Sequence, residues 1–85
     1  MSNLPNDLIQ KIDADFADAD VRASVKASLD SLWDRSLNVG PEELSRAIVF
    51  LVEGNYDEFQ EVRKTFYGDP RDVLLAASKK ARRSD

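Results

Sequence analysis

The 85-residue chain contains no cysteine and no histidine, and it has only three glycines and three prolines. Without cysteine there is no disulfide and no thiol nucleophile, and without both residue types there is no zinc site of the usual kind. So few glycines and prolines leave little sequence for loops, which favours helices. With 42% hydrophobic and 33% charged residues, the chain has the composition of one folded domain rather than of a disordered segment.

Catalytic, metal-binding and membrane motifs are also missing. The densest acidic cluster lacks the glycine and glutamate of a calcium loop, and no serine stands in a nucleophile motif. Each glycine falls where a helix is expected to end, not in a phosphate loop. We therefore expect no enzyme activity, no cofactor and no metal. No apolar run approaches the roughly 20 residues of a membrane span, and residues 1–5 do not resemble a signal peptide, so we expect a cytoplasmic protein without membrane contact.

Apolar residues recur at steps of three and four, the spacing that places them on one face of a helix. Five segments show this pattern, at about residues 5–16, 20–37, 41–53 and 56–67 and from residue 70 towards the C-terminus. The last three segments start after short joints rich in residues that end or begin helices. No segment alternates with period two for long. The sequence therefore predicts an all-α fold, a compact bundle of four to five short helices.

The third segment, at about 41–53, is the expected centre of this bundle. Residues 47–52 are six apolar residues in a row, and at about 100° per residue they cover the whole circumference of a helix. A helix that is apolar all round must be covered all round. Either the rest of the chain covers this helix, or Val49 and Phe50 face a second chain.

Large apolar side chains are the candidates for a protein interface. A domain of this size buries only about 60% of its unfolded surface, so some of these side chains contact a partner or stay exposed. The candidates are Trp33, Val49, Phe50 and Leu75, of which Leu75 lies off the main apolar face of its helix. They predict a small non-enzymatic protein-interaction module that self-associates through the apolar third helix, with a symmetric homodimer as the default assembly.

Charge is distributed unevenly along the chain. The net charge is −4, but residues 1–78 carry eight basic against fifteen acidic residues. We expect a single helical domain over residues 1–78 and a basic, frayed tail over residues 79–85. The tail is a candidate anion-binding segment, although bases near a helix C-terminus also offset the helix dipole. Its basic residues are Lys79, Lys80, Arg82 and Arg83.

Two other functions fit parts of this pattern. A nucleic-acid-associated adaptor would use the basic tail and residues 42–67, which have the outline of a helix-turn-helix. However, the helix that would enter the groove starts with Tyr56, Asp57 and Glu58, and acidic side chains repel phosphate. An acidic inhibitor or immunity-type protein would instead use the acidic body to cover a basic target surface.

Overall fold

The computed structural model describes residues 3–34 and 39–83, with the side chain of Arg83 outside the description. Within these residues the chain forms five α-helices, one short 3-10 helix and no strand, which confirms the predicted all-α fold. The elements are α1 (Asn6–Asp15), α2 (Ala19–Asp30), η1 (Ser31–Asp34), α3 (Pro41–Val52), α4 (Tyr56–Gly68) and α5 (Pro70–Arg83). None of the helices in this part of the chain has the length and apolar character needed to cross a membrane.

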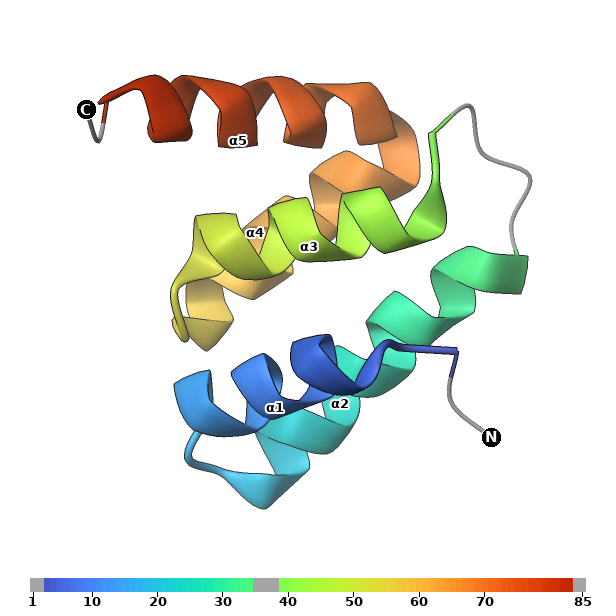
Figure 1. The fold of residues 1–85 in the computed structure, drawn as a ribbon, viewed down its shortest axis with the longest axis vertical. Helices are drawn as coiled ribbons and strands as arrows, with labels where there is room; N and C mark the ends of the chain where they lie inside the picture. The colour runs from blue at the N-terminus through green and yellow to red at the C-terminus, as the bar shows by residue number, and fades with distance from the viewer. Residues whose placement is uncertain (1–2, 35–38, 84–85) are drawn as a thin grey trace.

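The helices are stacked, with α1 and α2 at one end of the molecule and α5 at the other (Figure 1). Between them, α3 packs against α5, α4, α1 and η1. Because α3 contacts helices from both ends of the stack, it occupies the centre of the bundle, as the apolar run predicted. The outer side of α5 lies at the edge of the molecule (Figure 1).

Side-chain caps start three of the helices. Asp18 accepts hydrogen bonds from two backbone N–H groups of α2, at 2.8 and 3.2 Å. Asn55 accepts one from Glu58 at the start of α4 (3.1 Å), and Asp69 accepts one from Arg71 at the start of α5 (3.1 Å). These bonds satisfy N–H groups that the helix leaves unpaired.

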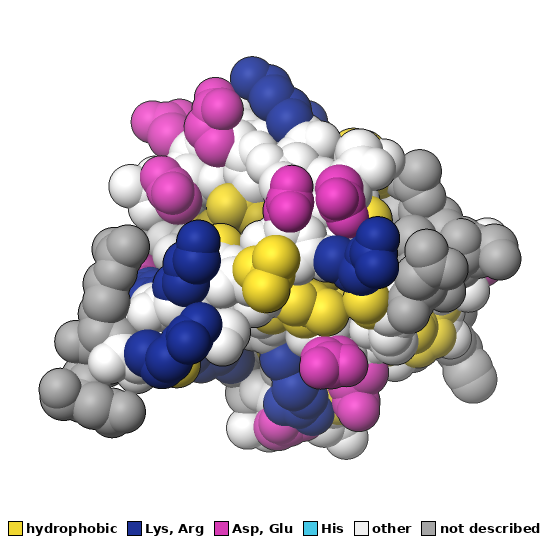
Figure 2. Space-filling view, turned by 90° about the horizontal axis from the view of Figure 1, so that it is seen from above, with side chains coloured by type: hydrophobic (Ala, Val, Ile, Leu, Met, Phe, Trp, Pro, Cys, Tyr) yellow, Lys and Arg dark blue, Asp and Glu magenta, His cyan; other side chains and the backbone are white. Residues whose placement is uncertain are grey.

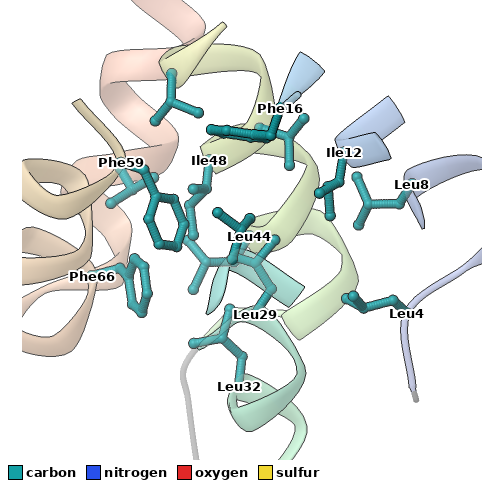
Figure 3. Packing of buried hydrophobic residues seen from close by; sticks show 14 residues of the cluster. Leu4, Leu8, Ile12, Phe16, Leu29, Leu32, Leu44, Ile48, Phe59 and Phe66 are labelled. Carbon is teal, nitrogen blue, oxygen red and sulfur yellow. The ribbon is translucent and has the colours of Figure 1, made fainter. Parts of the chain in front are cut away.

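A single hydrophobic core joins the helices. Figure 3 shows Phe59 and Phe66 of α4 beside Leu44 and Ile48 of α3. Fourteen hydrophobic residues of the described chain are buried: Leu4, Leu8, Ile12, Phe16, Val25, Leu29, Leu32, Leu44, Ile48, Val49, Val52, Phe59, Phe66 and Val73. Burying an aliphatic or aromatic side chain stabilises the fold by about 1.5–3 kcal/mol, so this cluster holds the bundle together.

Two boundaries differ from those expected. The helix predicted over residues 20–37 ends earlier, because the chain tightens into η1 after Asp30. At this change the Ser31 hydroxyl donates to the Ser28 carbonyl (2.6 Å), and Leu32 enters the core. The predicted end at residues 35–37 lies outside the described residues. The boundary expected after residue 78 falls inside α5, which continues as a helix to Arg83.

Candidate functional site

The middle helix, α3, is not apolar all round. Val49 is 3% exposed, whereas Phe50 is 41% exposed. Phe50 belongs to a solvent-facing stripe at steps of three and four that also contains Glu42, Glu43 and Arg46. Val49 packs against the chain's own core, so of the two alternatives its own chain covers it, and it is not an interface residue.

Lys80 of α5 reaches over the end of α3. Its Nζ donates hydrogen bonds to the carbonyl oxygens of Phe50 (2.8 Å) and Leu51 (3.3 Å) and lies 2.7 Å from a carboxylate oxygen of Glu53. The same ammonium lies 4.8 Å from the centre of the Phe50 ring. It thereby caps carbonyl groups that the helix leaves unpaired and makes a cation–π contact. The ammonium also holds the pKa of Glu53 below its usual value, through their hydrogen bond and charge attraction.

Because of this contact, the basic residues predicted to form the tail have different surroundings. Lys80 is half-buried and bound to α3, so it does not stand free to bind an external anion. Lys79 and Arg82 are exposed on the other side of α5, and the side chain of Arg83 lies outside the described residues. The structure therefore does not gather the predicted anion-binding residues on one surface.

Leu75 is the most exposed large hydrophobic side chain among the described residues, at 57%. Its helix buries Val73 on the opposite side, and about 100° per residue places Leu75 in the same outward row as Arg71 and Arg82. Figure 2 looks down on this side of the molecule. Hydrophobic side chains lie at its centre, and basic and acidic side chains surround them.

A groove of about 480 Å³ runs beside Leu75. Its lining residues are Val39, Asp69, Arg71, Asp72, Leu74 and Leu75. Val39 comes from the joint before α3, and the others come from the start of α5. The sequence pattern indicated only Leu75, because a contact between a joint and a distant helix leaves no periodic signal.

Phe50 lines a different groove. This one has about 340 Å³ and lies between α1 and α3. It is bordered by Arg46, which donates hydrogen bonds to both carboxylate oxygens of Asp7, at 2.6 and 3.1 Å. The Arg46 guanidinium holds the pKa of Asp7 below its usual value, chiefly through these hydrogen bonds. Trp33 in η1 is half-buried against the core, so the four predicted interface residues do not form one surface.

The acidic cluster near the start of α2 has local structural roles. Asp13 pairs with Lys26 (2.6 Å), Asp15 pairs with Lys11 (2.9 Å), and Asp18 caps α2. In the part of the chain that the structure describes, no three acidic residues are grouped so that they could hold a metal ion.

Comparison of the chain with models of protein families, with curated proteins and with solved structures found no significant match. Its function is therefore inferred from the surface of the molecule itself.

Proposed function

We propose that the chain is a non-enzymatic protein-interaction module, and that the outer face of α5 binds a second copy of the same chain. The observation that carries this proposal is the 57% exposure of Leu75, beside a groove with Val39 and Leu74 in its lining. Apolar side chains gathered at a groove gain free energy when a partner covers them. A symmetric homodimer uses the same patch on both chains, so Leu75 of each copy faces its counterpart.

The contacts of α3 favour α5 over α3 as the binding element. Val49 is buried in the core, and the ring of Phe50 already lies under the ammonium of Lys80. The groove at Phe50 is also bordered by the ion pair between Arg46 and Asp7. A partner docking on α3 would have to replace these contacts, whereas Leu75 contacts a partner without losing any.

Charge on α5 supports a second copy as the partner. The exposed side of this helix carries both signs, with Asp72 near its start and Lys79 and Arg82 near its end. A surface of mixed sign pairs with its own copy when the acid of one chain meets the base of the other. The net charge of −4 opposes this pairing only weakly at physiological salt.

Contact along one short helix gives a small interface. Interfaces of less than about 1,200 Å² are typical of weak and transient complexes. We therefore expect a dissociation constant between about 1 µM and about 1 mM. The module would be monomeric when dilute and would pair where its local concentration is high.

Sedimentation equilibrium from about 10 µM to about 1 mM covers this range and tests the proposal. The parent chain should change from monomer to dimer, and Leu75→Glu should remain monomeric, because a carboxylate at the interface centre must lose its water. Ala27→Glu is the matched control. It adds the same charge on an exposed position of α2, at the other end of the molecule from α5 (Figure 1).

Two results would contradict the proposal. A parent chain that stays monomeric at about 1 mM has no self-association in the expected range. A dimer that Leu75→Glu and Ala27→Glu weaken equally forms through another surface or responds only to net charge.

The other two functions stay predictions with less support. Lys80 is bound to α3, which leaves fewer bases for phosphate. Asp57 and Glu58 are exposed in the first turn of α4, the helix that would have to enter a nucleic-acid groove. For an acidic inhibitor, negative charge alone identifies no target surface.

A further inference from the structure

We infer that the two copies meet with their α5 helices antiparallel, so that Asp72 of each copy pairs with Lys79 of the other and Leu75 lies at the two-fold axis. This inference rests on the proposed self-association. It adds which segment of the second copy occupies the groove beside Leu75, namely the middle of its own α5.

The positions of Asp72 and Lys79 carry the inference. They are seven residues apart, which is about two helical turns, so they lie on the same flank of α5 with Leu75 between them along the axis. Both side chains are exposed. Neither takes part in an ion pair with another described residue, although nearby Lys80 does. Each copy thus presents, on one flank, an acid and a base that form no ion pair with the residues that the structure describes.

An antiparallel pair brings Asp72 of one copy to Lys79 of the other, and a parallel pair does not. When two identical helices pack antiparallel across a two-fold axis, the same flanks meet and the start of one helix faces the end of the other. With the axis near Leu75, position 72 then faces position 79 twice. In a parallel pair the two-fold axis runs along the helices and brings opposite flanks together, so the flank with Asp72 and Lys79 does not meet the same flank of the other copy.

The neighbouring charges fit the same arrangement. Arg71 lies opposite position 80, where the ammonium of Lys80 is directed towards α3 of its own copy. At the centre, Leu75 of each copy lies next to the groove with Leu74 and Val39 in its lining.

Charge reversal tests the pairing in a way that separates it from a loss of folding. Asp72→Lys and Lys79→Asp should each weaken self-association at least about tenfold, because both symmetric pairs become repulsive. An equimolar mixture of the two variants should associate at least as tightly as the parent chain. In the mixed pair, each lysine of one variant faces an aspartate of the other. The mixture should also weaken as salt is raised.

The matched control is the double variant Asp72→Lys with Lys79→Asp, which should regain self-association because both partners of each pair are exchanged. Sedimentation equilibrium measures all four samples, and circular dichroism checks that each variant keeps its helices. The antiparallel pairing would be overturned if each single variant self-associates as tightly as the parent chain and the mixture associates no more tightly than the single variants. In that case the parent dimer and its loss in Leu75→Glu would still support the proposed function.

Cysteine cross-linking gives a second measurement if a reversed variant fails to fold. The chain has no cysteine of its own, so an introduced thiol is unique. An oxidised mixture of Asp72→Cys and Lys79→Cys should form mainly the mixed disulfide between positions 72 and 79. Cross-links that join mainly like positions would contradict the inference.

Discussion

Lys79 and Lys80 are neighbours in the sequence, yet their ammonium groups lie in different surroundings. Lys79 is exposed, whereas Lys80 binds two carbonyl groups at the end of α3 and pairs with Glu53. A basic side chain near the C-terminus of a helix stabilises it through the helix dipole. Here the base comes from a different helix, so Lys80 also joins α5 to α3.

Replacing Lys80 by alanine should lower the free energy of unfolding by about 1–2 kcal/mol, since the variant loses charged hydrogen bonds and a cation–π contact. Lys79→Ala is the matched control, because it removes the same side chain one position away and should change stability by less than about 0.5 kcal/mol. Urea denaturation at about 10 µM, where we expect mainly monomer, measures both. Equal losses in the two variants would contradict the role given to Lys80.

The sequence could not distinguish these lysines, because only the placement of α5 along α3 does so. The exposure of Phe50 is different. Its spacing from Glu42 and Arg46 is eight and four residues, which places all three on one face. That spacing is typical of a polar stripe on α3, whereas the run of six apolar residues predicts burial on all sides.

At the scale of helices, the sequence predicted starts better than ends. Asp18, Asn55 and Asp69 cap helices through backbone groups two or three residues away, so the signal is local and can be read directly. The end of α2 depends on how Leu32 packs into the core. That information comes from distant residues, and the predicted helix was therefore too long.

The joint between α3 and α4 depends on Gly54. Its φ of 78° lies in the left-handed region, and a Cβ at this position would come 2.5 Å from the carbonyl oxygen of Asp15 in α1. The sequence predicted the left-handed conformation, since glycine often ends a helix in this way. The approach of α1 could not be predicted, because it depends on how the helices pack.

Gly54→Ala should therefore destabilise the fold by about 1–3 kcal/mol, through backbone strain and the clash with Asp15. Gly68→Ala is the matched control, since a Cβ there would meet no atom within 4 Å and its φ is not positive. We expect Gly68→Ala to leave stability unchanged or to raise it slightly. Thermal unfolding measures both, and a melting temperature for Gly54→Ala equal to that of the parent would contradict the close approach.

For the whole molecule, the sequence predicted a helical bundle around a central helix but not which side chains remain at the surface. Leu75 is an exception, because its position off the apolar face of its own helix indicates a surface contact. The groove beside it also needs Val39, which the fold brings to α5 from more than thirty residues away. Such a site depends on the arrangement of all the helices.

The uneven distribution of charge along the chain can be understood only from the whole fold. The acidic body and the basic end of the chain are not separate parts, because α5 packs on α3 along its length (Figure 1). Exposed bases near the end of α5 and acids near its start give one face both signs. This face is what we expect two copies to share.

The most direct test of this account is a comparison of amide chemical shifts at about 20 µM and about 1 mM, because the two concentrations lie towards opposite ends of the expected association range. The account predicts concentration-dependent shifts that are concentrated on α5 around Leu75, with Asp72, Lys79 and Val39 among the residues affected. Shifts centred instead on Phe50 and Arg46 of α3, or spectra that do not change with concentration, would contradict it.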